Sequence, residues 1–249
     1  MSFASKVVLV TGASSGIGAT TAVSFCKEGA NVVIVGRNEA KLKDVAKKCA
    51  GVGNAPFLVK ADVSNDNDAR RIISETLKKF GKLDVLVNNA GVAEYGSILD
   101  GKVLESFDKI IPINLRAVVH MTMLAAPHLV KTKGNIVNVS SIAGQKHIFV
   151  ASNVYSVSKA AVDHFTRGSA LELASKGVRV NAISPGPVET DMMTSFTTES
   201  EKETQGIRTP LGRMSKAEEI ADLILYVASD KAKGITGSVF VADNGMMVQ

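Results

Sequence analysis

Tyr155 and Lys159 lie four residues apart in the stretch Tyr155-Ser156-Val157-Ser158-Lys159, and each carries a group that can exchange a proton. In a helix, residues four apart lie on one face, so a phenol and an ammonium here would point into the same space. A neighbouring cation favours phenolate and lowers the tyrosine pKa from about 10 toward neutrality. That shift requires about 4 kcal/mol, which one lysine supplies only in a partly desolvated cleft. Taken alone, the pair also fits an ordinary surface helix.

A glycine-rich turn follows the first apolar run of the chain, Val7–Val10, and precedes a helical pattern. Gly12 allows a tight turn, Gly16 lets the backbone approach a ligand, and Gly18 allows the helix to pack closely on the strand. The N-terminus of the helix offers free N–H groups and a positive dipole to a pyrophosphate. This position between a strand and a helix favours a dinucleotide site over a turn without a ligand. We therefore expect the cofactor to contact Gly12, Ser14, Ser15, Gly16, Ile17 and Gly18.

Arg37 stands nineteen residues after Gly18, at the end of the second apolar run. In such a unit an acidic residue near this position binds the 2′-hydroxyl of NAD, whereas an arginine accommodates the 2′-phosphate of NADP. Gly36 places no carboxylate against the phosphate, and the Arg37 guanidinium offers it a fork of donors. Glu39 is close, but it suits the first turn of the next helix. The sequence therefore predicts NADP(H), with Arg37 and Asn38 among its contacts; a solvated loop arginine is the alternative.

Short runs rich in Val and Ile alternate with helical patterns along the 249 residues, and these elements must position the residues above. Apolar residues make up 45% of the chain, enough for one sizeable core, and no linker or repeat divides it. Apolar strands separated by helices are typical of a parallel sheet covered on both faces. We therefore expect one α/β domain over residues 1–249, with a Rossmann-type, doubly wound sheet of seven parallel strands. The expected strands are Val7–Val10, Asn31–Val35, Phe57–Val59, Leu83–Val87, Gly134–Val139, Val178–Ile183 and Ser238–Val241, and the expected helices are Ser15–Lys27, Glu39–Lys48, Asp66–Phe80, Val103–Val130, Val154–Ser175 and Ala217–Ala228.

Charge and composition argue against several classes of partner. The 29 basic and 24 acidic side chains are spread along the chain, so the net charge of +5 forms no block typical of nucleic-acid binding. The four histidines show no paired-ligand spacing and the cysteines, Cys26 and Cys49, no CxxC pattern, so we expect no metal and two reduced thiols. No apolar stretch approaches the roughly 20 residues that span a bilayer, and Met1–Lys6 carries no secretory signal pattern. The sequence thus predicts a cytoplasmic protein that binds neither nucleic acid nor a membrane.

Further motifs follow the glycine turn in a fixed order. The set is Thr11-Gly12-x3-Gly16-x-Gly18, Asn88-Asn89-Ala90-Gly91, Asn114, Ser140-Ser141, Tyr155-x3-Lys159 and Pro185-Gly186. Each motif is weak by itself, but the ordered set is far more specific. With this set the chain resembles the short-chain dehydrogenase/reductase family over essentially its whole length. The resemblance implies an oxidoreductase in which hydride transfer belongs to a nicotinamide cofactor.

The resemblance assigns a role to each of four residues. Tyr155 would be the general acid that gives a proton to a carbonyl oxygen during reduction, or the base in the reverse reaction. Lys159 would lower the tyrosine pKa and hold the hydroxyls of the nicotinamide ribose. Ser141 would polarise and orient the substrate oxygen. Asn114 would hold a water that links Lys159 to bulk solvent.

The spacing of these residues selects between two neighbouring serines. Ser141 precedes Tyr155 by 14 residues, one more than the commonest family spacing, and Ser140 would precede it by 15. We therefore expect Ser141 to contact the substrate and Ser140 to be a structural hydroxyl at a strand end. The extra residue is expected in the loop Gln145–Asn153, where it would reshape one wall of the substrate cleft.

The resemblance also places cofactor contacts at the carboxyl ends of strands, where ligands of open α/β sheets bind. Asp62 and Val63 resemble a pair that contacts adenine, whereas Asn88 is expected to hold neighbouring strands together. One departure from the family pattern is Ala242-Asp243-Asn244-Gly245, where Val-Asp-Gly-Gly is common, and it concerns subunit packing rather than catalysis. The expected contacts of this group are Asp62, Val63, Asn89, Ala90, Gly91, Tyr155, Lys159, Pro185, Gly186, Val188 and Thr190.

Residues 185–216 break the alternation of strands and helices with Pro, Gly, Thr and Ser mixed with large apolar residues. A long segment of this kind after the carboxyl end of a strand is typical of an active-site lid. We expect a lid at about 188–214, the alternative being an irregular surface excursion. The expected pocket residues are mostly apolar, which favours a lipophilic substrate: Val92, Tyr95, Phe149, Val150, Asn153, Met192, Met193 and Phe196.

Together these features predict an NADP(H)-dependent oxidoreductase that interconverts a carbonyl and a secondary alcohol, and that reduces a lipophilic ketone or aldehyde. A 3-oxoacyl reductase is one alternative, although the sequence has no evident basic patch to dock an acidic carrier. A non-catalytic NADP-binding regulatory protein is the other, although all four catalytic positions are filled. The helices at Val103–Val130 and Val154–Ser175 are expected to pack against other copies of the chain in a homotetramer or dimer.

Overall fold

A computed structural model describes residues 2–148, 150–194 and 209–248, and in it seven strands form one parallel sheet. The strands follow the order β3-β2-β1-β4-β5-β6-β7, so the direction of winding reverses between β1 and β4. Their ends lie within two residues of the expected ones, which confirms the predicted sheet. The strands are β1 (Val7–Thr11), β2 (Asn31–Gly36), β3 (Phe57–Lys60), β4 (Val85–Asn88), β5 (Asn135–Val139), β6 (Arg179–Pro185) and β7 (Val239–Ala242).

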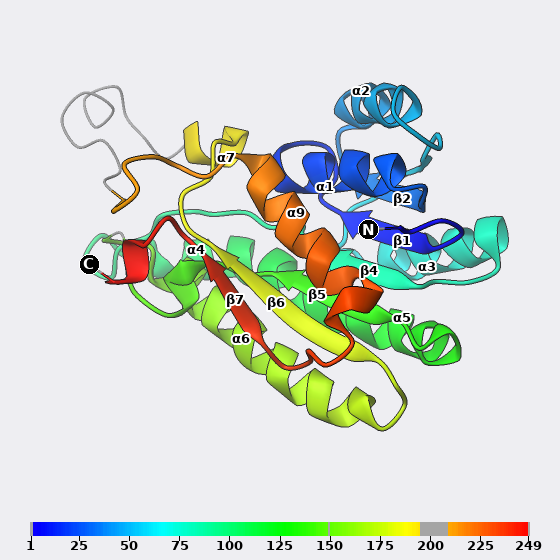
Figure 1. Cartoon of the computed structure of the whole chain (residues 1–249). Helices are drawn as coiled ribbons and strands as arrows, with labels where there is room; N and C mark the ends of the chain where they lie inside the picture. The colour runs from blue at the N-terminus through cyan, green and yellow to red at the C-terminus, as the bar shows by residue number, and fades with distance from the viewer. Residues whose placement is uncertain (1, 149, 195–208, 249) are drawn as a thin grey trace.

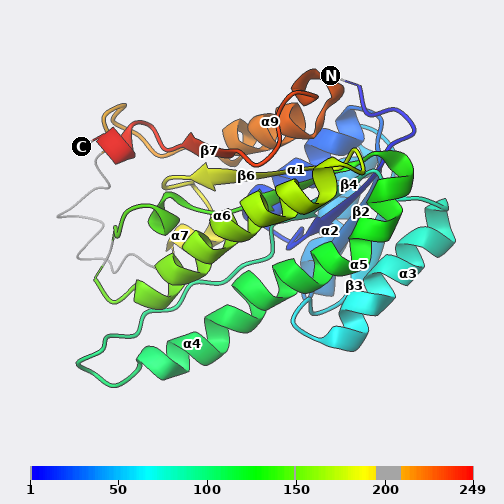
Figure 2. The same ribbon diagram turned by 90° about the horizontal axis from the view of Figure 1, so that it is seen from below.

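Helices cover both faces of the sheet, because each parallel connection must carry the chain back along the sheet. Figure 1 shows α1 (Gly16–Lys27), α2 (Glu39–Ala50) and α9 (Ala217–Ala228) on one face. Figure 2 shows the opposite face, which is covered by α3 (Asp66–Phe80), α4 (Val103–Ile111), α5 (Ala117–Thr132) and α6 (Asn153–Ala174). The short helix α7 (Asp191–Thr194) follows β6. This is the expected doubly wound, Rossmann-type fold.

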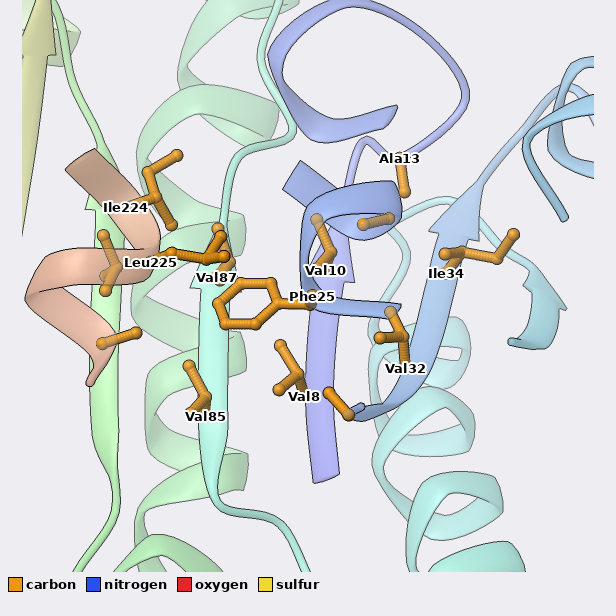
Figure 3. Packing of buried hydrophobic residues seen from close by; sticks show 14 of the residues in the cluster. Val8, Val10, Ala13, Phe25, Val32, Ile34, Val85, Val87, Ile224 and Leu225 are labelled. Carbon is orange, nitrogen blue, oxygen red and sulfur yellow. The ribbon is translucent and has the colours of Figure 1, made fainter. Parts of the chain in front are cut away.

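The hydrophobic core has one layer on each face of the sheet, because successive residues of a strand point to opposite sides. Val8 and Val10 join the cluster under α1, α2 and α9, whereas Val7 and Leu9 join the cluster under α3 and α5. Figure 3 shows the ring of Phe25, from α1, lying over Val8 and Val10. Phe25 is fully buried, and burying a side chain of this size contributes about 2–3 kcal/mol. These layers fix the strand ends at which the site forms.

The single helix expected at Val103–Val130 is instead two α-helices joined by a π-helical turn, Pro112–Arg116. Pro112 has no N–H to donate within the helix, and the N–H of Ala117 bonds to the Pro112 carbonyl five residues back. A π-turn inserts an extra residue and rotates the side chains around it. Asn114 lies in this turn, so the break determines where its side chain points.

The helical run Val103–Thr132 is also long and apolar enough, by length and composition alone, to cross a membrane. The sequence expectation that no such stretch exists was therefore wrong. Met121, Ala125 and Leu129 are fully or almost fully buried within the core cluster that lies between the sheet and α3. This packing explains part of the apolar composition, since 39% of the apolar window is buried inside the domain.

The expected lid at 188–214 lies partly outside the described residues, which leave out 195–208. Its two described ends are joined at the base by a parallel bridge between Val188 and Ser215. The N–H of Glu189 donates to the Ser215 carbonyl at 3.0 Å, and the N–H of Ser215 donates to the Pro187 carbonyl at 2.9 Å. The segment therefore leaves and rejoins the domain at one place, directly after β6.

Candidate active site

A cavity of about 350 Å³ lies at the carboxyl ends of β1, β4, β5 and β6, where the winding of the sheet reverses. The turn after β1 and the ends of β2 and β3 form its phosphate end. The end of β5, helix α6 and the segment after β6 form its other end. Ligands of open α/β sheets bind at this reversal, so the cavity is the candidate site.

Gly12 and Gly16 have positive φ angles of 65° and 52°, which residues with a side chain rarely adopt. A Cβ on Gly12 would come within 2.7 Å of Ala90 Cα, so the turn after β1 packs directly against the turn after β4. Gly12, Ser14, Ser15, Gly16 and Ile17 line the cavity as expected. Its wall here is therefore mainly backbone and small side chains, which leaves room for a phosphate group.

Gly18 and Asn38 were expected to contact the cofactor, but neither lines the cavity, and each has a structural role. A Cβ on Gly18 would overlap the Gly12 carbonyl oxygen and the Asn89 amide nitrogen. The Asn38 side chain accepts a hydrogen bond from the Lys41 N–H at 3.0 Å and so caps α2. Gly18 therefore allows close packing, and Asn38 begins the helix after the arginine turn.

Side chains at the ends of β1 and β4 hold the phosphate turn in place. The Thr11 hydroxyl accepts hydrogen bonds from the N–H groups of Asn89 and Ala90 at 3.0 and 3.1 Å. The Asn89 amide donates to the carbonyls of Thr11 and Gly12 at 2.9 and 3.1 Å. Asn88 donates to the Asn138 side chain on β5 at 2.9 Å, which confirms its expected role between strands. Sequence reasoning gave Thr11 no such role, although a polar residue that ends a buried strand was the available signal.

Arg37 lies at the adenosine end of the cavity with 64% of its side chain exposed. Its Nη1 atom is 3.9 Å from Asp62 Oδ2, a distance too long for a hydrogen bond. Asp62 is instead held by Ser64, whose N–H and hydroxyl donate to Oδ1 at 2.9 and 2.7 Å. Asp62 and Val63 both line the cavity. The guanidinium thus keeps its donor fork available to a ligand.

At the other end, α6 places Tyr155 and Lys159 one turn apart beside Ser141, which follows β5. The Ser141 hydroxyl lies close enough to the Tyr155 phenol to lower its pKa, and it accepts a hydrogen bond from the Ala143 N–H at 3.2 Å. The Lys159 ammonium donates to the Val139 carbonyl at 2.9 Å and lies 5.7 Å from the centre of the Tyr155 ring. The predicted serine, tyrosine and lysine therefore meet in one place.

The pKa values of this pair differ from the expectation that Lys159 would lower the pKa of Tyr155. Burial raises the pKa of Tyr155, the Ser141 hydrogen bond opposes that rise, and Tyr95 adds to it. Burial also lowers the pKa of Lys159 to about 8. Loss of water penalises both phenolate and ammonium, and this cost outweighs their mutual attraction across the observed separation.

Asn114 is 1% exposed, and its side chain is engaged by protein groups. Its Oδ1 atom accepts from the Val92 N–H at 2.8 Å, and its Nδ2 atom donates to the Val92 carbonyl at 2.8 Å and the Ser158 hydroxyl at 3.3 Å. Asn114 therefore supports the turn at Gly91–Val92, and its expected water stays a prediction. Ser140 is buried, and its hydroxyl donates to the Lys159 carbonyl at 3.2 Å, as expected of a structural serine.

The walls of the cavity agree in part with the expected pocket. Val92, Tyr95, Met192 and Met193 line it, as do the cofactor-contact candidates Ala90, Gly91, Pro185, Gly186, Val188 and Thr190. Val150, in the loop before α6, is 94% exposed, and neither it nor Asn153, the first residue of α6, lines the cavity. Phe149 and Phe196 lie outside the described residues. Sequence reasoning missed Ile113, Ile148 and Met246, which come from the π-turn, this loop and the C-terminal segment.

The C-terminal segment reaches the cavity because it is fastened beside β6. A Cβ on Gly186 would come within 2.7 Å of Asp243 Cα, and the Asp243 carboxylate accepts from the N–H groups of Gly245 and Met247 at 2.9 and 2.7 Å. Asn244 has a φ angle of 54°, a conformation that asparagine tolerates better than most residues. Its amide donates to the Ser215 hydroxyl at the base of the expected lid at 2.9 Å. The departure from the family pattern at Asn244 therefore keeps a glycine-like turn.

Comparison with known proteins agrees with this geometry. A family model described as enoyl-(acyl carrier protein) reductase matches residues 12–247. The chain is 37% identical over 244 residues to a 3-oxoacyl-[acyl-carrier-protein] reductase of Thermotoga maritima, covering 98% of both chains. The chain belongs to the short-chain dehydrogenase/reductase family. It is also 36% identical to a cis-4-hydroxycyclohexanecarboxylate dehydrogenase of Sinomonas cyclohexanicum, covering 98% of this chain and 97% of that one.

Solved structures of this family share the fold. A Caenorhabditis elegans short-chain dehydrogenase/reductase with cofactor gives a TM-score of 0.91 at 38% identity, over 99% of this chain and 96% of that chain. A short-chain dehydrogenase of Burkholderia cenocepacia J2315 in complex with NADP gives a TM-score of 0.92 at 30% identity, over 99% and 100%. The protein is therefore an oxidoreductase of the short-chain dehydrogenase/reductase type, with a seven-stranded Rossmann-type fold. Within the described ranges, no group of three or more His, Cys, Asp or Glu side chains is placed to hold a metal ion.

Proposed function

We propose that the protein is an NADP(H)-dependent carbonyl reductase, which converts a lipophilic ketone or aldehyde to an alcohol. The observation that carries this proposal is that Ser141, Tyr155 and Lys159 line one cavity, with Lys159 one helical turn from Tyr155 and the Ser141 hydroxyl close enough to lower the tyrosine pKa. These three groups line the same cavity as the phosphate turn. A proton donor and a dinucleotide cradle thus share one space.

The residues present fit a nicotinamide dinucleotide. Gly12 and Gly16, both at positive φ, shape a backbone cradle that lines the cavity, and the N-terminus of α1 directs free N–H groups toward it. Arg37 and Asp62 would hold the adenosine end, and Lys159 with the segment Pro185–Thr190 would hold the nicotinamide end. When bound, the nicotinamide supplies the hydride.

The side chains of the site perform the proton transfer and the orientation. The pKa of Tyr155 lies above its usual value of about 10, so its oxygen holds a proton at neutral pH and can give it to a carbonyl oxygen. Ser141 orients that carbonyl with its hydroxyl. Lys159 has a pKa of about 8 and is mostly charged at neutral pH, which stabilises negative charge that develops nearby. A protonated tyrosine suits reduction, because oxidation would first require its proton to leave.

Two observations support NADP over NAD. Arg37 is exposed within the cavity and makes no hydrogen bond to Asp62, so its donors are available to a 2′-phosphate. The Burkholderia cenocepacia relative, 30% identical, was solved in complex with NADP. A charge-assisted, bidentate contact of this kind favours NADP over NAD by about 1.5–3 kcal/mol.

The apolar cavity wall supports a lipophilic substrate. Val92, Tyr95, Ile148, Met192 and Met246 come from four different segments and line the cavity that Tyr155 also lines. The best test follows the oxidation of NADPH with cyclic ketones, aldehydes and steroids, using the Tyr155→Phe variant as the blank. The proposal expects turnover of at least one apolar ketone that depends on Tyr155. Absence of turnover across the screen, despite tight NADPH binding, would contradict it.

A 3-oxoacyl reductase is the second candidate, because the Thermotoga maritima relative named for that activity is 37% identical over 98% of the chain. Acetoacetyl-coenzyme A separates the two candidates in the same assay. A higher kcat/KM with the thioester than with apolar cyclic ketones would favour the second candidate. The reverse order would favour the first.

We also propose that the chain assembles as a homotetramer or dimer through the face formed by α4, α5 and α6. Six large apolar side chains on these helices are exposed: Leu104 (70%), Phe107 (46%), Val119 (38%), Met123 (58%), Val157 (57%) and Leu171 (83%). Several exposed apolar side chains on neighbouring helices are typical of an interface. Light scattering of the wild type and of Met123→Glu tests the proposal, which predicts an oligomer and its dissociation. A wild-type monomer would contradict it.

A further inference from the structure

Asp163 is a buried acid that the reaction above leaves without a role. Its side chain lies on α6 and the residue is 3% exposed. Within the described part of the chain, neither of its carboxylate oxygens has a hydrogen-bond partner of good geometry. Buried polar groups in native proteins are usually paired, and an unpaired carboxylate is costly. Such a group needs a physical explanation.

Asp163 continues the stripe of α6 that carries the catalytic pair. Tyr155, Lys159 and Asp163 follow one another at intervals of four residues, so they lie on one face, about 6 Å apart along the helix. This stripe faces the end of β5, as the hydrogen bonds of Lys159 to Val139 and Ser140 show. Asp163 therefore occupies the turn directly behind the catalytic lysine.

The end of β5 contacts the stripe one residue at a time. The Ser141 hydroxyl lies close enough to the Tyr155 phenol to lower its pKa, and the Val139 carbonyl accepts a hydrogen bond from the Lys159 ammonium at 2.9 Å. Between them, the Ser140 hydroxyl donates to the Lys159 carbonyl at 3.2 Å and lies close enough to Asp163 to stabilise its carboxylate. Residues 139–141 and the α6 stripe thus form one continuous contact.

The charges of Lys159 and Asp163 act on each other. Burial lowers the pKa of Lys159, and Asp163 opposes that change. Burial raises the pKa of Asp163, and the Ser140 hydroxyl, Arg167 and Lys159 oppose that rise. Arg167 is the exposed next member of the stripe, one turn beyond Asp163. Among the described residues of β6, α4, α5 and the π-turn, which pack against α6, no further charged group shifts either pKa.

We propose that Asp163 is a positioning residue, a buried counter-charge that keeps Lys159 cationic and held at the Val139 carbonyl. The inference rests on the proposed function only where it gives Lys159 a catalytic task. Its physical content is an electrostatic pair inside α6, which exists whether or not the protein reduces a ketone. A carboxyl with a purely structural role would leave the titration of Lys159 unchanged.

The test follows the titration of Lys159 directly. Protein labelled with ¹³C at the lysine Cε is titrated by NMR, with the Lys159 signal assigned from the Lys159→Met spectrum. Asp163→Asn keeps the shape of the side chain and removes its charge, and Glu172→Gln removes an exposed charge from the same helix. The inference expects the lysine midpoint to fall by about one pH unit in Asp163→Asn and to stay unchanged in Glu172→Gln. An unchanged midpoint in Asp163→Asn would overturn it.

A second measurement needs no variant of Asp163. If Lys159 and Asp163 are coupled, the Lys159 signal of the wild type should also shift at the pH at which Asp163 titrates. That pH should lie above the usual aspartate pKa of about 3.9, because burial raises the pKa of Asp163. A Lys159 signal with a single inflection would overturn the inference even if Asp163→Asn does not fold.

Measurements of ketone reduction distinguish an error in the role of Asp163 from an error in the proposed function. If reduction of a ketone by NADPH is found, its alkaline limb should move to lower pH in Asp163→Asn, with similar rates at pH 6. A shifted lysine titration without any ketone reduction would mean that only the proposed function is wrong. Ketone reduction with an unshifted titration would mean that only the role of Asp163 is wrong.

Discussion

The phosphate end of the cavity is built from backbone and glycine, whereas the catalytic end is built from buried side chains. At the phosphate end, Gly12 and Gly16 shape the turn, and the charged group, Arg37, stands 64% exposed. At the catalytic end, Lys159 is 5% exposed, and Tyr155 and Lys159 both have pKa values shifted by burial. Solvent therefore screens the charge of Arg37 at the phosphate end, whereas the buried charge of Lys159 at the catalytic end is screened much less. Single substitutions should have larger effects at the catalytic end.

The largest expected effect is that of Tyr155→Phe. Loss of the proton donor should lower kcat by about 10³-fold, because general acid catalysis contributes 10²–10⁴-fold. NADPH binding, measured by fluorescence titration, should change little, because the phosphate end is untouched. Tyr226→Phe, on α9 away from the cavity, is the matched control. Near-normal turnover of Tyr155→Phe would remove the tyrosine from the mechanism.

Arg37→Asp should have the next largest effect, confined to the phosphate end. Replacing a cation with an anion at the 2′-phosphate should raise the KM for NADPH by about 10–100-fold and shift preference toward NADH, with kcat nearly unchanged. Steady-state kinetics with both cofactors measure this. Arg70→Asp, an exposed arginine outside the cavity, serves as the control. An unchanged preference would contradict the assignment of the 2′-phosphate to Arg37.

The pH dependence should distinguish the buried lysine from the exposed arginine. With a pKa of about 8, Lys159 loses its charge above that pH, so kcat for reduction should fall by up to tenfold per pH unit. Stability should change in the opposite direction. The unfolded lysine keeps its proton up to about 10.4, so between pH 8 and 10 the unfolded state binds more protons than the folded state. The free energy of unfolding therefore rises over this range, because the folded protein no longer carries the cost of a buried lysine charge. Urea unfolding of the wild type and Lys159→Met across this range isolates the effect; a flat difference between them would contradict it.

Lys41→Met should have the smallest effect. The Lys41 ammonium lies 2.7 Å from Asp191 Oδ2 and links α2 to α7 at the rim of the cavity, but the two side chains are 52% and 69% exposed. Exposed ion pairs contribute about 0.2–1 kcal/mol, so the KM for NADPH should change by no more than about fivefold, and less at high salt. Lys48→Met on the same helix is the control. A tenfold or larger change would mean that the phosphate end depends on side-chain charge more than its exposure suggests.

The sequence predicted the helices and strands well, because the patterns that determine them join residues close together in the chain. Helices α3 and α9 begin and end at the expected residues, and each strand lies within two residues of its expected bounds. The helix expected at Val103–Val130 forms as one helical run, Val103–Thr132, but a π-helical turn at Pro112–Arg116 interrupts its α-helical pattern, which the apolar spacing alone did not predict. Val150 was expected in the pocket, yet it is 94% exposed because the loop that carries it has no periodic pattern to fix its direction.

The sequence by itself determined the strand-turn-helix around Gly12 and the shared face of Tyr155 and Lys159, because both follow from residue type and helical spacing. The tertiary structure alone decided which groups surround that face. The packing of α6 against the end of β5 buries Lys159 and Asp163 together, and the fastening of the C-terminal segment beside β6 brings Met246 to the cavity. It also decided the direction in which the Tyr155 pKa moves, since desolvation depends on atoms distant in the chain. Spacing places a side chain on a face, and only packing determines whether water reaches it.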